Sequence, residues 1–288
     1  MSRKSRNLWL CICALAVCAA CFAVQGLTFH QLESRKARMV SPIFLDITMI
    51  RLQNVHKLTG DAVIMGSSMT ERLFASQKTA VIGVPSSSFL AGLQVMKGAV
   101  NFPPGTTYIV EINNLFNGIY EPVLEETAKW SFRTFRNSKH FSIAAKPSNL
   151  LLSIAYAIAK PQISSDQSFD ISDEAIQQPQ DISAALLPTE NELKEWRDII
   201  SGIEQIQQVN KGKICFACLP TLAPGDGLEA YNKACKLAKH LNLPVLNYNT
   251  DYWRNKLEFT DQRHLNSARS STLRFRDIVA RDARNCSK

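Results

Sequence analysis

Short apolar runs separated by segments of helical spacing constrain the fold of this chain more than any other feature. Turn residues such as Gly66 and Pro244 border several of the runs, which are 62–65, 80–84, 107–112, 214–219 and 245–248. Runs of this length indicate buried strands, and the apolar spacing over 90–100 and 228–241 indicates helices. Strands that alternate with helices form βαβ units. We therefore predict an α/β three-layer sandwich with a mainly parallel, five-stranded sheet.

An uncharged apolar segment extends from Leu8 to Val24 and can continue to Phe29. About 20 such residues cross a bilayer, so the segment is long enough to span a membrane. Basic residues precede it, which favours a cytoplasmic N-terminus and an exported main domain. Small residues near its C-terminal end leave cleavage as a signal peptide open. We prefer an uncleaved anchor and predict a single-pass membrane protein with an extracytoplasmic (periplasmic or cell-surface) domain.

The formal net charge of +8 is concentrated beside this segment. Residues 1–40 hold six basic residues and one acid, a net +5, which leaves +3 for residues 41–288. Basic residues near the C-terminus alternate with Asp277 and Asp282, which indicates a solvated helix face. A weaker alternative is contact with anionic lipid or an anionic polymer. Neither interleaved aromatic residues nor a nucleic-acid motif is present, so we expect no nucleic-acid partner.

The chain divides into three predicted parts. Residues 1–29 form a cytoplasmic stub and membrane anchor, residues 30–59 a juxtamembrane helical linker, and residues 60–288 one α/β domain. Residues 119–205 interrupt the alternation of strands and helices, and we treat them as an insertion in that domain. The insertion contains a polar stretch over 162–180. A lid and a partner-docking element are both open as its role.

Four of the eight cysteines lie in the apolar segment. Cys215 and Cys218 have the spacing of a metal knuckle or a redox pair. A strand at this position places their side chains on opposite faces, and no second pair or histidine cluster completes a zinc site. We expect core packing for both, with a redox or metal protein as a remote alternative. The sequence also allows one disulfide, for example between Cys235 and a neighbouring cysteine, and does not assign it. No metal-ligand cluster or glycine-rich phosphate cradle predicts a cofactor.

Gly66-Ser67-Ser68-Met69-Thr70 follows the first predicted strand and precedes a helix. A serine at a strand-to-helix turn presents its hydroxyl at the edge of the sheet, and the N–H groups of the helix start can stabilise an oxyanion. An ordinary turn with a helix cap explains the same residues. Ser68 is the candidate nucleophile of this segment.

Asp261 and His264 lie near the C-terminus, after the fifth predicted strand and before a final helix. A serine nucleophile needs a base, and the base needs an acceptor that orients it. An aspartate three residues before a histidine can supply both groups. The other four histidines lie in segments without this context. We therefore predict Ser68, His264 and Asp261 as nucleophile, base and orienting carboxylate.

The order of these segments resembles that of the SGNH (GDSL-like) hydrolase family. Gly66-Ser67-Ser68-Met69-Thr70 is similar to the family's Gly-Asp-Ser-Leu-Thr block, and Asp261-Gln-Arg-His264 is similar to its closing Asp-x-x-His block. The resemblance covers roughly residues 60–115 and 210–280. It implies a sheet of the flavodoxin-like type and the catalytic roles given above.

Two middle blocks of the family are altered in this chain. Ser86 stands where the family has a glycine that supplies an oxyanion N–H. Glu111-Ile-Asn113-Asn114 stands where the family has Gly-x-Asn-Asp. The resemblance therefore implies Ser86 and Asn114 as oxyanion or substrate-binding groups, with Asn113 as the alternative to Asn114. Ser67 is expected to form the turn, and Glu111 to be a structural hydrogen-bonding carboxylate.

The exported, anchored arrangement is similar to the branch of this family that modifies cell-envelope polymers, including DltD-like and alginate-acetylation proteins. That resemblance implies a serine esterase or O-acyltransferase, with acetyl as the acyl group and an acylated envelope glycan or acyl donor as substrate. The alternative is a catalytically silent SGNH-like domain that binds an envelope polymer or a membrane-protein partner. The altered middle blocks and the insertion favour this alternative.

Overall fold

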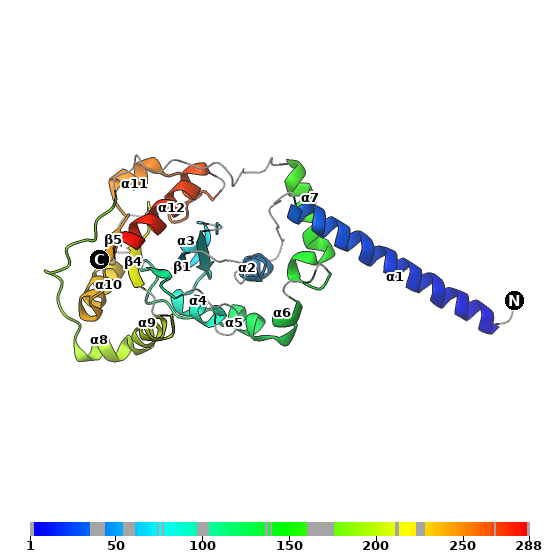
Figure 1. The fold of residues 1–288 in the computed structure, drawn as a ribbon, viewed down its shortest axis with the longest axis horizontal. Coiled ribbons are helices and arrows are strands. Elements are labelled where there is room, and N and C mark those ends of the chain that lie inside the picture. The colour runs from blue at the N-terminus through cyan, green and yellow to red at the C-terminus, as the bar shows by residue number, and fades with distance from the viewer. Residues whose placement is uncertain are drawn as a thin grey trace. The chain divides into compact units, whose positions relative to one another are not determined.

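A computed structural model describes most of the chain, in the residue ranges 3–34, 44–53, 61–73, 75–76, 78–96, 104–135, 138, 140–159, 176–210, 213–222, 228–267 and 269–286. The chain forms two compact units (Figure 1). The first unit combines Met1–Asn54 with Glu126–Gln162, and the second combines Val55–Glu125 with Ile163–Lys288. Each unit is described separately below.

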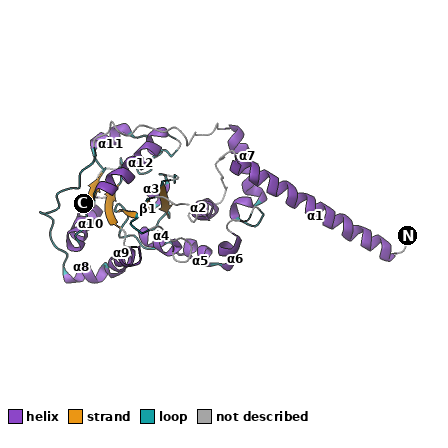
Figure 2. Ribbon diagram, in the orientation of Figure 1, coloured by secondary structure: helices purple, strands orange, loops and turns teal. Residues whose placement is uncertain are grey.

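The second unit contains a five-stranded sheet in which all strand pairs are parallel (Figure 2). The strands are β1 (Ala62–Gly66), β2 (Thr79–Gly83), β3 (Thr107–Glu111), β4 (Lys213–Cys218) and β5 (Val245–Asn247). Their order in the sheet is β2-β1-β3-β4-β5. The α/β class and the five-stranded sheet are confirmed, and the sheet is parallel throughout. In doubly wound sheets of this order, ligands bind at the carboxyl ends of the strands, where β1 and β3 are neighbours.

Helices cover both faces of the sheet (Figure 1). On one face, residues of α12 (Ser270–Asn285) form one apolar cluster with Ile64 and Ile109. On the other face, α4 (Phe89–Met96) contacts α9 (Arg197–Asn210), and Gly92 of α4 lies against Ile82. Ile82 pairs with Met65, the residue after Ile64, and successive side chains of a strand point to opposite faces. The two helical layers therefore lie on opposite faces of the sheet.

The remaining helices of the second unit follow local sequence signals. Thr189 and Glu192 form a capping box that starts α8, and buried Ile199, Ile203 and Ile206 give α9 one apolar stripe. The other helices of this unit are α3 (Ser68–Glu71), α8 (Glu190–Glu195), α10 (Leu228–Leu241) and α11 (Asp251–Lys256), while α5 (Glu121–Ala128) passes from the second unit to the first.

All the regular secondary structure that the structure describes in the first unit is helical. It contains α1 (Arg3–Ser34), α2 (Phe44–Gln53), α6 (Trp130–Phe135), η2 (Ile143–Ala145) and α7 (Pro147–Ala159). Residues Ile12–Ser34 of α1 are long and apolar enough to cross a bilayer. The helix continues past residue 29, where the anchor was predicted to end. Of the predicted linker, 35–43 and 54–59 lie outside the described residues, and α2 lies between them.

The predicted insertion is divided between the two units. Its first part, 126–159, joins the N-terminal helices in the first unit, whereas α8 and α9 belong to the second. Within its polar stretch, 162–175 lies outside the described residues. The first part of the insertion therefore belongs to the unit that contains α1, and the sheet belongs to the other unit.

Candidate active site

Ser68 lies where the chain leaves the central part of the sheet. Strand β1 ends at Gly66, and α3 begins at Ser68 with Ser67 as its N-cap. The Ser67 Oγ accepts a hydrogen bond of 3.2 Å from the N–H of Met69, which closes the turn. An alanine at position 66 would overlap the side chains of Glu111 and Thr70, so this turn requires glycine. The strand-to-helix turn predicted for Ser68 is present.

The structure brings Ser68, His264 and Asp261 into one hydrogen-bonded series. The Ser68 Oγ lies 2.9 Å from His264 Nε2, although 196 positions separate the two residues. The other ring nitrogen, Nδ1, lies 2.8 Å from Asp261 Oδ2. An ionised carboxylate only accepts hydrogen bonds, so Nδ1 carries the proton and Nε2 is left to accept the hydroxyl proton of Ser68. This is the arrangement of a nucleophile, its general base and the group that orients the base.

The loop that carries His264 is fixed by its own backbone. Asp261 Oδ1 accepts the N–H of Arg263 at 2.7 Å and the N–H of His264 at 2.8 Å. An antiparallel bridge pairs Phe259 with Leu265 on either side of these residues. Thr221, after β4, donates its Oγ1–H to the Gln262 carbonyl at 2.9 Å. The imidazole is therefore held both by its own loop and by the exit of β4.

The pKa of the Asp261 carboxyl is lowered to about 2. Partial desolvation acts in the opposite direction and raises the pKa, but hydrogen bonds from the Arg263 N–H and from the ring and N–H of His264 outweigh it. More than half of the Asp261 side chain is exposed to solvent. The carboxylate therefore stays ionised above roughly pH 4 and can accept the Nδ1 proton of His264.

Glu111 organises the nucleophile turn from the adjacent strand. Its carboxylate is 1% exposed at the end of β3. Oε2 accepts the Ser67 N–H at 2.8 Å, the Thr70 N–H at 3.2 Å and the Thr70 Oγ1–H at 2.7 Å. The Ser67 Oγ–H donates to Oε1 at 2.8 Å, and the Asn114 Nδ2 donates to the same oxygen at 2.9 Å. The sequence predicted a structural hydrogen-bonding role for Glu111, and these bonds define that role.

The two asparagines predicted as oxyanion groups are engaged with the protein itself. Asn114 Nδ2 donates to Ser67 Oγ at 2.9 Å as well as to Glu111. Asn113 exchanges two bonds with the backbone of Leu219, its Nδ2 donating at 2.9 Å and its Oδ1 accepting at 2.7 Å. Asn113 thereby ties the exit of β3 to the exit of β4. An oxyanion role for either amide stays a prediction.

Two backbone N–H groups at the same edge are available as donors. Neither the Ser68 N–H nor the Ser86 N–H donates to an acceptor within the described part of the chain. Ser86 is exposed and has a φ of 58°, in the left-handed region where glycine is favoured. Gly66 pairs with Gly83, and the Val84 N–H donates to the Gly66 carbonyl at 2.9 Å. The exits of β1 and β2, which carry the two serines, are therefore neighbours.

Sequence reasoning did not identify Thr70 as part of this arrangement. Its hydroxyl is buried against Glu111, and it belongs to the same Gly66–Thr70 segment that supplied the nucleophile. The available signal in the sequence was Glu111, because a carboxylate at the end of an apolar strand needs hydrogen-bond donors around it. Which donors they are depends on the order of the strands.

The structure also places the cysteines that were considered for metal or redox chemistry. Cys215 and Cys218 are both buried in β4, and Cys215 Sγ lies 3.1 Å from the Sγ of Cys286. The hydrogen bond with the neighbouring Cys286 thiol, followed by burial, raises the pKa of the Cys215 thiol. Among the residues that the structure describes, no group of three or more His, Cys, Asp or Glu side chains could hold a metal ion.

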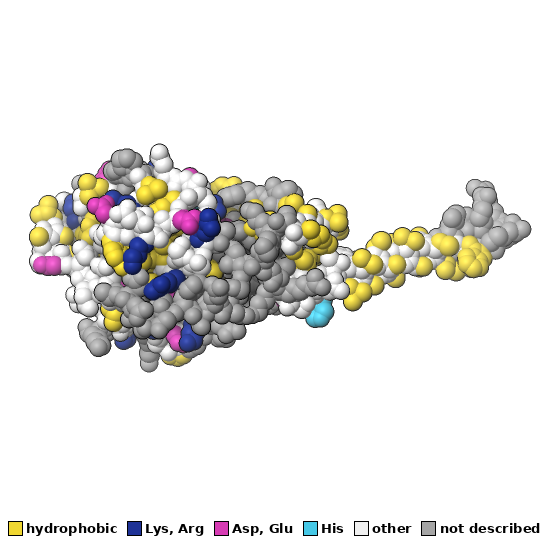
Figure 3. All heavy atoms as spheres, turned by 90° about the horizontal axis from the view of Figure 1, so that it is seen from above, with side chains coloured by type: hydrophobic (Ala, Val, Ile, Leu, Met, Phe, Trp, Pro, Cys, Tyr) yellow, Lys and Arg dark blue, Asp and Glu magenta, His cyan; other side chains and the backbone are white. Residues whose placement is uncertain are grey.

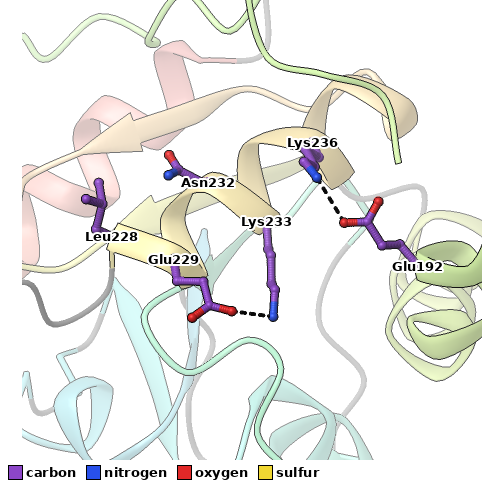
Figure 4. A pocket seen from close by; sticks show the side chains of 6 residues that line it. All are labelled: Glu192, Leu228, Glu229, Asn232, Lys233 and Lys236. Carbon is purple, nitrogen blue, oxygen red and sulfur yellow. Dashed lines mark hydrogen bonds and ion pairs between the residues drawn. The ribbon is translucent and has the colours of Figure 1, made fainter. Parts of the chain in front are cut away.

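An open hollow elsewhere in the second unit is lined by residues of α8 and α10 (Figure 4). Its charged side chains pair with one another, Lys233 with Glu229 at 2.7 Å and Lys236 with Glu192 at 2.9 Å. Leu228 and Asn232 are the other described residues that line it. Among the described residues that line the hollow, the charged side chains are paired with one another, and Ser68 is not one of these residues.

No family model matches the chain, and neither the curated proteins nor the solved structures contain a match to it.

Proposed function

We propose that the second unit is a serine esterase or O-acyltransferase of the SGNH type, with an acetyl group as its acyl group. The observation that carries this proposal is the distance of 2.9 Å between Ser68 Oγ and His264 Nε2, together with the contact of His264 Nδ1 with Asp261. A chance approach of a serine and a histidine would not explain why a carboxylate fixes the second ring nitrogen. The order of the strands and the position of the Asp261–His264 loop before the last helix support the SGNH assignment.

The first half of the reaction follows from this geometry. Ser68 Oγ attacks the carbonyl carbon of the ester while its proton moves to His264 Nε2. Asp261 accepts the Nδ1–H throughout and stabilises the imidazolium. The carbonyl oxygen gains negative charge, and the N–H groups of Ser68 and Ser86 stabilise it. His264 then gives its proton to the leaving alcohol oxygen, which leaves an acyl group on Ser68.

The second half repeats these roles with a different nucleophile. Water or the hydroxyl of an acceptor loses its proton to His264 Nε2 and attacks the acyl carbonyl. The tetrahedral intermediate collapses, and the proton returns from His264 to Ser68 Oγ. Water gives an esterase, and a sugar hydroxyl gives an acyltransferase. Each oxyanion donor contributes about 100- to 1,000-fold to turnover, so the two backbone groups are central to the rate.

The substrate class follows from the first unit. We propose that α1 anchors the chain with its N-terminus in the cytoplasm and its second unit outside, where the acylated polymers of a cell envelope are found. The uncharged part of α1 and the basic residues before it support this orientation. The substrate is then an acylated envelope glycan or an acyl donor to it, and a membrane-protein partner is compatible with the same anchor.

The test uses full-length protein in detergent, a fluorophosphonate probe and acetate release from small acetyl esters. We expect labelling and acetate release by the parent, and loss of both in Ser68→Ala and His264→Ala. Ser201→Ala, which changes an exposed serine of α9, is the matched control and should behave as the parent does. Labelling of Ser68→Ala as strong as that of the parent would contradict the proposal.

A second candidate function is a catalytically silent domain that binds an envelope polymer or a membrane protein. The observation in its favour is the engagement of Asn113 and Asn114 by Leu219, Ser67 and Glu111. A parent protein that binds acylated glycan but neither reacts with the probe nor releases acetate would establish this function instead.

A further inference from the structure

Helix α7 buries two polar side chains inside the first unit, beside Leu150, and exposes several of its large apolar side chains. Asn149 and Ser153 are 1% and 0% exposed, whereas Leu151 and Ile158 are 69% and 81% exposed. Leu152 is also exposed, on the same face. In a water-soluble protein a surface helix has the opposite arrangement. An apolar face of this kind indicates that the medium around α7 is itself apolar.

Several of the polar side chains inside this unit are hydrogen-bonded to the backbone or to one another. Asn149 Nδ2 donates to the Ile143 carbonyl at 2.8 Å, and the Ser153 Oγ–H donates to the Asn149 carbonyl at 2.6 Å. Asp46 of α2 is nearly buried and pairs with Lys146 at 2.9 Å. A hydrogen-bonded interior with an apolar exterior is what a protein surface in contact with lipid requires.

The apolar exterior is continuous with α1, the helix that is long enough to cross a bilayer. Gln25 Nε2 of α1 donates to the carbonyl oxygens of His140 and Ala145 at 2.8 and 2.7 Å, just before α7. Figure 3 shows yellow apolar side chains along α1 and on the surface beside its C-terminal end. The exposed apolar residues of the first unit include Val24 and Leu27 of α1. A bilayer that surrounds α1 therefore also reaches the elements that contact Gln25.

A row of aromatic rings extends from α1 across this surface. Phe22 lies against Phe141 with ring centroids 5.8 Å apart, Phe141 against Phe135 at 5.3 Å, and Phe135 against Trp130 at 5.5 Å. Trp130 is 71% exposed at the end of the row. Tryptophan is enriched at the boundary between lipid and water, because its ring is apolar and its N–H needs a polar partner.

The length of α7 decides how it lies in the bilayer. Its 13 residues carry no charge and are bordered in the sequence by Lys146 and Lys160. At 1.5 Å per residue the helix is about 20 Å long. The hydrocarbon core of a bilayer is about 30 Å thick, so α7 cannot span it. A short apolar helix with a cation at each end lies along the interface instead.

We propose that the outward face of α7 (Leu151, Leu152, Ala155 and Ile158), together with Trp130 and Phe141, is a lipid-binding surface that enters the same bilayer leaflet from which α1 emerges. The ligand is the acyl-chain region of phospholipid. This assigns the first part of the insertion to membrane contact and holds whether or not the second unit is an enzyme.

The test uses the full-length protein in phosphatidylcholine vesicles made either with brominated or with unbrominated acyl chains. Bromine quenches tryptophan emission only at short range. Ile158→Trp and Leu151→Trp each add one indole on the outward face of α7. Leu187→Trp adds one at a position of the second unit that is 62% exposed and serves as the matched control. The parent protein, with its four tryptophans, gives the baseline to subtract.

We expect brominated lipid to remove most of the emission that Ile158→Trp and Leu151→Trp add, and to leave the emission added by Leu187→Trp. Trp130→Phe should also reduce the quenched part of the parent's emission. Unquenched indoles at positions 151 and 158 would overturn the proposal, as would equal quenching at position 187. Quenching at only one of the two α7 positions would also overturn it, because two helical turns place both on one face.

Discussion

Replacing Glu111 with glutamine tests whether the carboxylate holds the nucleophile turn in place. Glu111→Gln keeps the size and shape of the side chain but turns one acceptor oxygen into an NH2 group. If the amide oxygen stays at the position of Oε2, the NH2 group faces Asn114 Nδ2, which is itself a donor. If the group is flipped, the NH2 faces the N–H groups of Ser67 and Thr70. Either orientation leaves a buried donor without an acceptor.

The magnitude follows from these bonds. Hydrogen bonds to a charged group contribute about 1.5–3 kcal/mol and neutral ones about 1 kcal/mol, so three bonds at Oε2 each lose part of their energy. The unsatisfied donor adds about 1–3 kcal/mol. After relaxation of the turn, we expect the free energy of unfolding to fall by about 2–4 kcal/mol. For a domain of roughly 200 residues this lowers the Tm by about 5–15 °C.

The effect on chemistry is measured well below the Tm of the variant. Ser68 follows Ser67 directly, so a shift of the turn moves the Ser68 hydroxyl away from His264. A displacement near 1 Å can cost about 100-fold in rate, and we expect the rate of fluorophosphonate labelling to fall about 10- to 100-fold.

Asp282→Asn is the matched control for this experiment. Asp282 is fully buried on α12 and accepts bonds from Tyr248 Oη at 3.0 Å and Arg281 Nη2 at 2.7 Å, but it does not bond to the nucleophile turn. The Asp282→Asn substitution should lower the Tm without slowing the fluorophosphonate labelling of the folded protein. Equal loss of labelling in both variants would refute a positioning role for Glu111, and so would a labelling rate in Glu111→Gln equal to that of the parent.

Two further predictions concern the neighbouring strand and the acid side of the pH profile. In Gly83→Ala, the added Cβ would overlap the backbone of Glu71, so we expect the free energy of unfolding, measured in thermal melts, to fall by about 1–3 kcal/mol. A Tm equal to that of the parent would show that α3 can shift without cost. Because the pKa of Asp261 is lowered to about 2, its carboxylate stays ionised above roughly pH 4, so Asp261→Asn should lower kcat/KM for ester hydrolysis by a constant factor between about pH 4 and pH 8. A loss of activity in Asp261→Asn that disappears toward pH 4 would mean that Asp261 of the parent is protonated in that range.

The elements that the sequence predicted well are those defined by local pattern. The apolar runs at 62–65, 107–112 and 214–219 correspond to β1, β3 and β4 within one residue at either end. The alignment is close because a parallel strand is buried on both faces, and its apolar run ends where burial ends. The position of Ser68 at the end of β1 followed for the same reason, since a strand that ends at a glycine turn fixes where the next residue lies.

The hydrogen-bond partners could not be predicted in the same way. Asn113 and Asn114 are adjacent in sequence and chemically identical, yet one bonds to Leu219 and the other to Ser67. Their partners lie 106 and 47 positions away, and only the folded backbone selects between them. The inverted face of α7 had a local signal, because a helix with no charge over 13 residues is unusual at a protein surface. Its contact with α1, which gives that signal its meaning, is a tertiary feature.

The order of the strands explains why the candidate site forms where it does. Strand β1 lies between β2 and β3, so the turn that carries Ser68 has one exit loop on each side. The β3 side supplies Glu111, and the β2 side supplies the loop that contains Ser86. Neighbouring strands are about 4.8 Å apart, and the next strand along is about twice as far. If β2 lay between β1 and β3, the Glu111 carboxylate would start nearly 10 Å from the turn, beyond the reach of direct hydrogen bonds to Ser67 and Thr70. The geometry of the nucleophile turn therefore depends on the crossover from β2 past β1 to β3, which no local pattern in the sequence specifies.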